Sequence, residues 1–422
     1  MKRIEILIYS LVLFLIIYNP PIRAGLSFTT IAVVSSSILC IVYNKEFGII
    51  MRMHNVRSLA KWVVAFLFYD VAVCGIIYLS SRNNLVRSSL VGDLISHISI
   101  CFLSLGLVVF ALKKHWSTER FCLTYVLAGL YQAILGVICL VSPPIKSIFT
   151  ALTIANSSSE KIRNSVEVLA SIRNYGFASS LYDIFGMTMS VLAVLAIALG
   201  LRGNKMYYMV AALITLAAVI NSRTSFVLTA IGAIIMFLSH SGKGFSKGWL
   251  TSRIVLFPIA IVGVGSLFTW LLGNASTEQL EWLATAVIES QSMLEGEEVG
   301  FYDTLLNNFM IFPSDFFEVV LGTGLTPADA INHNSDVGYI QYLWKHGIIG
   351  SALLYTIFIK LFKYAKKRQL WPYSSFITAL SVMVAVYLVK LTCLGYSMAS
   401  VIFVPICLYM IVTDDKKLDR CG

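Results

Sequence analysis

Residues 322–350 read GTGLTPADAINHNSDVGYIQYLWKHGIIG, and they pass from a polar loop into an apolar helix. Four consecutive polar residues, His333 to Asp336, stand at that transition. Polar groups at the edge of an apolar phase are costly unless they find partners or serve a function. We therefore expect this stretch to carry the chemistry, and the rest of the chain to indicate which side of a membrane it faces.

The composition is typical of a membrane protein. Of the 422 residues, 58% are hydrophobic and 13% are charged, and the mean hydropathy is +0.80. A soluble chain carries about 25% charged residues. Apolar runs of about 16–24 residues recur, close to the length that a helix needs to cross a bilayer, where backbone groups must be bonded within helices. The expected fold is an all-α polytopic membrane protein, with one integral membrane domain over residues 1–422.

Twelve membrane spans are predicted from the apolar runs: 4–18, 27–43, 62–80, 94–112, 121–141, 177–200, 206–221, 223–239, 254–272, 338–362, 373–390 and 394–412. If both termini are cytoplasmic, 22 of the 32 Lys and Arg residues fall on inner segments. Positive charge gathers on the cytoplasmic side of membrane proteins. The bias therefore predicts cytoplasmic termini, and it accounts for the net charge of +10 without a nucleic-acid partner.

Two outer loops are longer than simple connections require. The loop over 142–176 contains a possible capping box at Ser157–Glu160, followed by apolar residues on one helical face, which predicts a short helix on the membrane surface. The loop over 273–337 holds 11 of the 22 acidic residues and no Lys or Arg, and short helices are expected over 277–294 and 301–312. Long loops between compact spans usually serve a function.

Neither a metal nor another cofactor is expected. The eight cysteines lie in or beside apolar segments or in the tail, without the spacing of a disulfide framework or a zinc site. The acidic run Glu295–Glu298 is more typical of a solvated loop than of a cation site.

His333 is the candidate catalytic base. A neutral imidazole accepts a proton from a hydroxyl near neutral pH, and this histidine stands at the outer boundary between loop and helix. The alternative is that the polar residues from Asn332 to Asp336 only cap the helix that follows, since Asn, Ser and Asp are preferred caps.

Two outward-facing arginines are candidates for binding an anion. Arg223 separates two apolar runs almost without a loop, and a guanidinium at that depth is costly unless it meets an anion. Its forked donors suit a phosphate, with snorkelling to lipid headgroups as the alternative. Arg173 precedes the sixth span, with Asp183 a few turns deeper, and its alternative is a solvated loop charge.

Ionisable residues within the spans are few. Asp70 in the third span is expected to be almost alone at that depth, where one carboxylate is a weak signal for a proton relay in a transporter. His97 near the outer end of the fourth span and His346 about two turns into the tenth are expected to be simple interhelical hydrogen-bonding groups.

Taken together, these features resemble the superfamily of O-antigen polymerases (Wzy-type) and O-antigen ligases (WaaL-type), which are membrane glycosyltransferases. The resemblance covers roughly residues 165–365. Four elements occur in matching order: Arg173-x-x-Gly176, Ser222-Arg223, the late outer loop ending in Gly322-x-Gly324, and His333-Asn334 followed by Tyr342-Leu343 and Gly347-Ile348-Ile349-Gly350.

The resemblance implies a metal-independent, inverting enzyme with a C-type glycosyltransferase fold. Its substrates would be glycans on undecaprenyl pyrophosphate at the periplasmic face of the bacterial inner membrane. His333 would be the general base, and Arg223 with Arg173 would hold the donor pyrophosphate as negative charge develops on it. Asn334 and Asp336 would line the substrate site, and we expect Asp336 to orient or charge-balance the imidazole.

The chain departs from the family pattern at one position. Many relatives carry an arginine where the loop helix begins, but this chain has Phe301-Tyr302-Asp303 there. The second cation of a pyrophosphate clamp is therefore assigned to Arg173.

The expected function is that of an O-antigen polymerase in lipopolysaccharide biosynthesis, with a lipid-linked glycan donor and acceptor, membrane lipids and a chain-length regulator as partners. The nearest alternative is an O-antigen ligase, which transfers finished glycan to lipid A-core. The acidic outer loops offer no extra basic patch for that phosphate-rich acceptor, and this favours the polymerase. A lipid-linked oligosaccharide flippase or a non-catalytic scaffold are alternatives from other classes.

Overall fold

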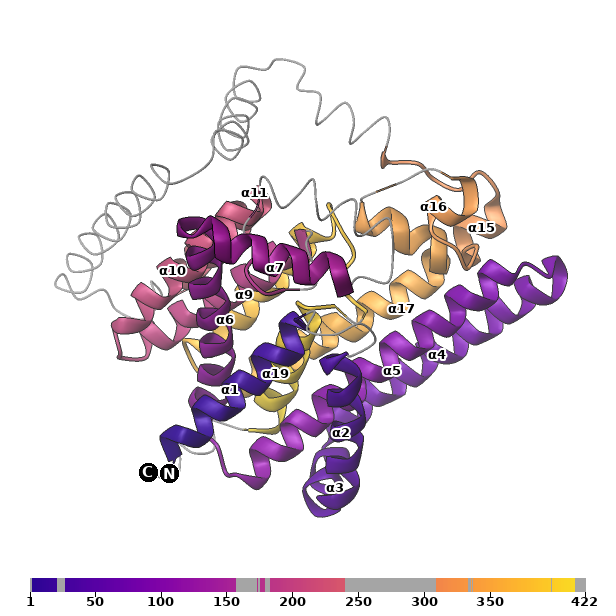
Figure 1. Cartoon of the computed structure of the whole chain (residues 1–422). Helices are drawn as coiled ribbons and strands as arrows, with labels where there is room; N and C mark the ends of the chain where they lie inside the picture. Colours follow the sequence, from indigo (N-terminus) through magenta and orange to yellow (C-terminus); the bar gives the residue numbers. More distant parts are fainter. Residues whose placement is uncertain are drawn as a thin grey trace. The chain divides into compact units, whose positions relative to one another are not determined.

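The computed structural model describes residues 2–20, 27–156, 173, 175–178, 183–239, 309–332, 335, 337–395 and 397–413. Every regular element in these ranges is a helix (Figure 1). The prediction of an all-α fold is therefore confirmed for the described residues.

Five of the described helices are long and apolar enough to cross a membrane, or six if one bent pair counts as a single span. The five are α4 (His54–Ser81), α5 (Asn84–Lys113), α6 (Thr118–Val141), α9 (Asp183–Leu201) and α17 (Gly338–Arg368), and the bent pair is α2 (Phe28–Val42) with α3 (Asn44–Arg52). Shorter apolar helices accompany them. These helices indicate a membrane-embedded protein.

Eleven of the twelve predicted spans coincide with a described helix, and the twelfth, 254–272, lies outside the described residues. By length and composition, only the five helices named above, or six with the bent pair, are long enough to count as spans. The total of twelve spans therefore stays a prediction. Some helices exceed their predicted bounds. α5 begins ten residues before the predicted residue 94, because the Asn83 side chain caps it by accepting a hydrogen bond from the Leu85 amide at 2.9 Å.

The chain packs as two compact units. Unit 1 comprises Met1–Val34, Trp116–Ser290 and Leu370–Leu380, and unit 2 comprises Ser35–His115, Gln291–Gln369 and Ser381–Gly422. Of the described helices, α2 and α18 (Tyr373–Tyr387) have residues in both units. The predicted single membrane domain over 1–422 stays a prediction.

Unit 1 is built around α9. It contains α1 (Lys2–Tyr18), α6, α7 (Pro143–Asn156), α9, α10 (Met206–Asn221) and α11 (Arg223–Leu238). α9 packs against α6, α10 and α11, and every residue from Phe185 to Leu201 is buried. A helix that is apolar on all sides is expected to be surrounded by other helices. Ser190 supports the close packing by donating a hydrogen bond to the carbonyl oxygen of Ser225 on α11 at 3.1 Å.

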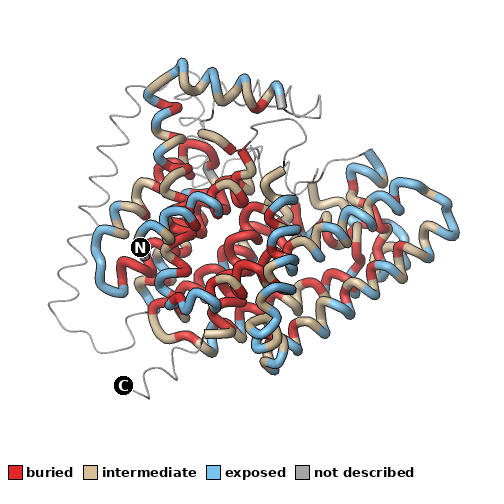
Figure 2. The backbone as a smooth tube through the Cα atoms, turned by 60° about the horizontal axis from the view of Figure 1, so that its bottom comes forward, coloured by how far each residue is buried: buried red, intermediate tan, exposed pale blue. Residues whose placement is uncertain are grey.

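Unit 2 is built around four helices, α4, α5, α17 and α19 (Ser400–Val412). α4 and α5 form a long hairpin whose tip carries exposed residues (Figure 2). α17 packs against α4 and α19, and α19 also packs against α5. Two short helices, α15 (Phe316–Leu321) and α16 (Pro327–Ile331), precede α17, and α15 packs on it.

α17 is not the continuous helix that the sequence predicts over 338–362. Its backbone breaks at Gly347, which has φ 63° and ψ −172°, outside the helical region. Helical conformation resumes after the glycine and runs to Arg368. The break divides α17 into a segment of nine residues, 338–346, and a longer one.

The two predicted outer loops are described in part. Helix α7 occupies 143–156 of the first, starting at a proline, which suits the first position of a helix. α15 and α16 are short helices within the second loop. The predicted surface helix after Ser157 and the predicted helices over 277–294 and 301–312 lie outside the described residues, apart from 309–312.

Candidate functional site

The predicted site residues are described unevenly. His333, Asn334 and Asp336 lie outside the described residues, and for Arg223 only the backbone is described, as the first residue of α11. Arg173 is described and partly buried. The described residues show the surroundings of these positions within each unit.

A tight turn at Gly322–Gly324, the Gly-x-Gly turn, is hydrogen-bonded to the last helical residues before the break in α17. The Thr323 amide donates to the Trp344 carbonyl oxygen at 2.7 Å, and the Thr323 hydroxyl donates to the same oxygen at 3.0 Å. The Gly324 amide donates to the Lys345 carbonyl oxygen at 3.1 Å. We call this set of contacts between the Gly-x-Gly turn and Trp344–Gly347 the glycine clasp.

The local sequence explains why the clasp forms. Asp315 caps α15 by accepting from the Phe317 amide at 2.7 Å, and Gly322 ends the helix with φ 88°, a conformation that favours glycine. A break in a helix leaves the carbonyl oxygens of its last turn in need of donors. The amides of the Gly-x-Gly turn supply those donors, so the turn satisfies carbonyl oxygens that the break at Gly347 leaves without a partner in the helix.

The segment that contains His333 is anchored on both sides. Asn332 ends α16 with φ 52°, and Ser335 is buried. The Ser335 hydroxyl donates to the Phe309 carbonyl oxygen at 2.6 Å, and the Gln341 amide group donates to the Ser335 carbonyl oxygen at 2.5 Å. The N-cap of α17 is Val337, which makes no side-chain capping bond. The contacts of Ser335 therefore fix the described part of this segment, and the N-cap side chain of α17 takes no part in this.

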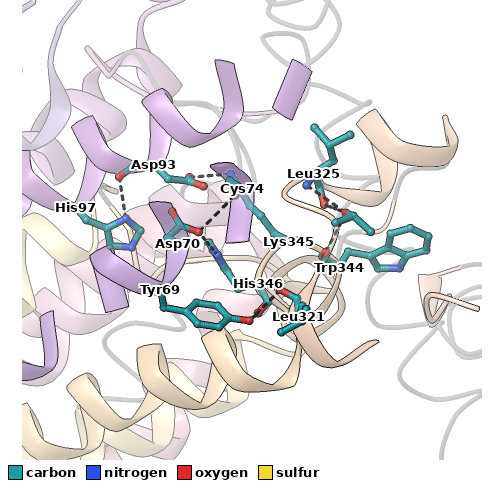
Figure 3. A network of polar contacts seen from close by, with 11 residues as sticks. Tyr69, Asp70, Cys74, Asp93, His97, Leu321, Leu325, Trp344, Lys345 and His346 are labelled. Carbon is teal, nitrogen blue, oxygen red and sulfur yellow. Dashed lines mark hydrogen bonds and ion pairs between the residues drawn. The ribbon is translucent and has the colours of Figure 1, made fainter. Parts of the chain in front are cut away.

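Five ionisable side chains from three helices of unit 2 form a charged cluster (Figure 3): Asp70, Asp93, His97, Lys345 and His346. A hydrogen bond of 2.9 Å joins His346 Nδ1 to Asp70 Oδ1, and Lys345 Nζ donates to Asp93 Oδ1 at 2.7 Å. The His97 Nδ1–H donates to the Asp93 carbonyl oxygen at 2.9 Å.

The cluster is strongly desolvated. The side chains of His346 and Asp70 are 1% and 2% exposed, and those of Lys345 and Asp93 are 18% and 16% exposed. The Phe66 ring lies against both histidines, with centroid distances of 5.1 and 5.3 Å. Three buried polar atoms have no hydrogen-bond partner among the described residues: Asp70 Oδ2, Asp93 Oδ2 and His97 Nε2. Burying such groups costs free energy, so a buried cluster of this kind is a candidate functional site.

The expectation that Asp70 is almost alone at its depth is wrong. Asp70 pairs with His346, and a second ion pair lies beside it. His346 is an interhelical hydrogen-bonding group as expected, whereas the hydrogen bond of His97 stays within α5, and both histidines belong to one charged network. A sequence signal existed, because Asp93, Lys345 and His346 are ionisable residues near the predicted boundaries or within spans. Which helices face one another cannot be derived from those positions.

Two motifs of unit 1 meet at the start of α9. The Ser222 hydroxyl, between α10 and α11, donates to Asp183 Oδ1 at 2.8 Å, and Asp183 is the first residue of α9. Arg173 Nη1 donates to the Tyr175 hydroxyl at 2.7 Å, and the Tyr175 ring lies 5.6 Å from the ring of Phe185 on α9. The segments that precede Gly176 and Arg223 are thus both anchored at the same end of this buried helix.

Asp70, Asp93 and His346 lie close enough for a metal ion, since one ligand atom from each falls within 4.8 Å of the others. Charge balance argues against a divalent cation. With the histidines neutral, two carboxylates and one ammonium give −2 + 1 = −1, and a divalent ion would change this to +1. A single positive charge would neutralise the cluster.

A scan against protein-family models finds no match, and comparisons with curated proteins and with solved structures find no significant match either. The family assignment therefore rests on the motifs of the chain itself, as a resemblance.

Proposed function

We propose that the protein is a membrane glycosyltransferase of the O-antigen polymerase type. It would join undecaprenyl-pyrophosphate-linked oligosaccharide repeat units at the periplasmic face of the inner membrane. The observation that supports this best is the glycine clasp. Gly322, Gly324 and Gly347, which belong to the motifs of the resemblance, take conformations with positive φ. Gly322 lies against Gly347, and the Gly324 amide donates to the Lys345 carbonyl oxygen, so these contacts join the two ends of the stretch 322–347, which includes His333.

In this proposal the reaction is a direct displacement. The acceptor hydroxyl oxygen attacks the anomeric carbon of the donor sugar, and the bond from that carbon to the pyrophosphate oxygen breaks. His333 takes the hydroxyl proton, while Arg223 and Arg173 stabilise the leaving lipid pyrophosphate. Asn334 and Asp336 line the acceptor side, with Asp336 supporting the charged imidazole.

The anchoring in unit 1 supports the arginine roles. Preorganised cations stabilise developing charge best when they need not move during the reaction. Arg173 is held by the Tyr175 hydroxyl, and Ser222, the residue before Arg223, is held by Asp183. Arg173 is therefore anchored by its own side chain, and Arg223 directly follows an anchored residue.

Deleting the gene and analysing surface lipopolysaccharide on a gel tests the proposal. The expected result is the loss of the long ladder, with core plus a single repeat unit remaining, because polymerisation fails while ligation continues. Bare core with long glycan on the lipid carrier would identify a ligase. An unchanged ladder would exclude both. Complementation with wild type and with His333→Ala, at matched expression, then tests the base.

A second candidate function is a proton-coupled transporter of lipid-linked oligosaccharide. The charged cluster favours it, because ionisable groups buried between membrane helices mark ion and proton pathways. Asp70 lies 12 residues from the hairpin tip at Arg82, about 18 Å along a 28-residue helix. Such a protein would leave bare core after deletion, with unpolymerised repeat units retained at the inner face.

A further inference from the structure

We propose that the Asp70–His346 pair is a proton-binding site of this protein, and that loss of its proton loosens the glycine clasp. The ligand is a single proton, exchanged with solvent. This goes beyond the proposed function, because it concerns a site in unit 2 that has no assigned role in glycan transfer.

With neutral histidines, the formal charges of the cluster sum to −1 over the described residues, so one additional positive charge would neutralise it. His97 donates from Nδ1 and has no partner for Nε2 among the described residues, so a second proton on its ring would be a buried, unpaired donor. His97 is therefore neutral. Lys345 balances Asp93 at 2.7 Å, which leaves the charge of Asp70 to be balanced. A proton shared between Asp70 and His346 balances it, whichever of the two atoms holds it.

Among the described residues, α19 offers no group that supplies this charge. α19 packs against α4, α5 and α17, and its sequence has no Asp, Glu, Lys, Arg or His. The titratable groups that face the pair from the described helices are these: Tyr69 and Cys74 on α4, Asp93 and His97 on α5, and Tyr342 and Lys345 on α17.

The same two residues of α17 belong to the cluster and to the clasp. The side chains of Lys345 and His346 bind the two aspartates, and the Lys345 carbonyl oxygen accepts from the Gly324 amide. Tyr69 adds a direct link, because its hydroxyl lies 3.1 Å from the His346 carbonyl oxygen and 2.9 Å from that of Leu321.

Deprotonation of the pair would therefore change the contacts of the glycine clasp. Without its proton the pair becomes a carboxylate beside a neutral imidazole, and the cluster carries a net charge of −1. Lys345 is then attracted by two carboxylates instead of one, or water enters to solvate Asp70. Either response displaces the residues just before the break at Gly347, whose carbonyl oxygens hold the Gly-x-Gly turn.

The test uses the full-length protein in lipid nanodiscs. Imidazole ¹⁵N spectra report the protonation of His346 between pH 5 and 9, with His346→Gln giving the assignment. Hydrogen exchange, corrected for its intrinsic pH dependence, reports the amides of Thr323 and Gly324. We expect the spectra to show the loss of one proton from the pair as the pH rises, and the exchange of the two amides to rise by about tenfold with the same midpoint, as when one net hydrogen bond is lost.

Two charge-neutralising variants must move the midpoint in opposite directions. Lys345→Gln removes a positive neighbour, so the pair holds its proton to higher pH. Asp93→Asn removes a negative neighbour, so the pair loses its proton at lower pH. Each shift should be about 1 pH unit or more, because the charge removed is close to the pair. The control is Glu46→Gln, whose partner Lys113 lies 20 residues from Asp93 on α5, about 30 Å away, and which should leave the midpoint unchanged.

Four results would overturn the proposal. The first is the absence of any titration of His346 between pH 5 and 9. The second is a titration without a matching change in the exchange of Thr323 and Gly324. The third is a midpoint that moves with sodium concentration at constant pH, which would identify a metal cation as the ligand. A shift of the same sign in Lys345→Gln and Asp93→Asn also contradicts it, and general unfolding cannot produce opposite signs.

Discussion

Gly322 and Gly347 lie back to back, since a Cβ atom on either residue would stand 2.5 Å from the backbone nitrogen of the other. The two residues are 25 positions apart, and they close the segment of unit 2 that contains the Gly-x-Gly turn, α16 and the start of α17. Real Cβ atoms do not approach backbone atoms this closely. The pair therefore explains why glycine is needed at both positions.

Replacing Gly347 by alanine should disrupt the clasp. The new methyl group meets backbone atoms of Val320, Leu321 and Gly322, and the positive φ of 63° adds a strain of about 1 to 3 kcal/mol. We expect faster exchange of the Thr323 and Gly324 amides and a lower thermal midpoint for the protein in detergent. Gly75→Ala on α4 is the matched control, because open space surrounds Gly75 and alanine favours helix there. Equal behaviour of the two variants would contradict the clasp.

The ion pair of Asp93 and Lys345 should show strong coupling. Replacing either residue alone by alanine leaves an uncompensated charge in a largely buried setting, with an expected cost of about 3 kcal/mol or more. The double variant should cost less than the sum of the two single changes. A double-mutant cycle on the free energy of unfolding measures this difference. Simple additivity would mean that the pair contributes no coupling energy.

Ser222→Ala tests the anchoring of the Arg223 segment in unit 1. The variant removes the donor to Asp183 Oδ1 at a buried position, which should cost about 1 to 3 kcal/mol of stability. Thr215→Ala on α10 is the control, because its hydroxyl donates only to the Ala211 carbonyl oxygen of its own helix among the described contacts. That change should stay within about 0.5 kcal/mol. Chemical unfolding in mixed micelles compares the two.

The all-α architecture and most helix positions followed from the sequence because apolar runs determine them. α9 illustrates this, since the apolar run over 177–200 predicted a span and corresponds to a buried helix. The break at Gly347 could not be predicted in the same way. One glycine in an apolar run is compatible with a continuous helix, and the break depends on amides that arrive from residues 323 and 324.

The charged cluster was missed for a related reason. Asp70 and His346 are 276 positions apart, and only the packing of α17 against α4 brings them to 2.9 Å. Hydropathy identifies spans but not which spans are neighbours or which faces meet. The polar residues from His333 to Asp336 were recognised from the sequence because they interrupt the apolar pattern, and their catalytic role stays a prediction.

Arg223→Lys should impair glycan synthesis although it keeps the positive charge. Lysine offers a single ammonium in place of a forked, planar donor set that binds two phosphate oxygens at once. We expect shortened or absent long-chain lipopolysaccharide at normal protein levels. Arg120→Lys, at an exposed position near the start of α6, is the matched control and should leave the ladder intact. A normal ladder in Arg223→Lys would remove Arg223 from the proposed clamp.

The most direct test of the proposed function is polymerisation by the purified full-length protein in liposomes. The substrate is a lipid-pyrophosphate-linked repeat unit from the host, supplied without other enzymes and without divalent cations. We predict that wild type produces a ladder of longer lipid-linked glycans and that His333→Ala, inserted to the same level, produces none. Failure of wild type to extend the substrate, or a full ladder from His333→Ala, would contradict the account.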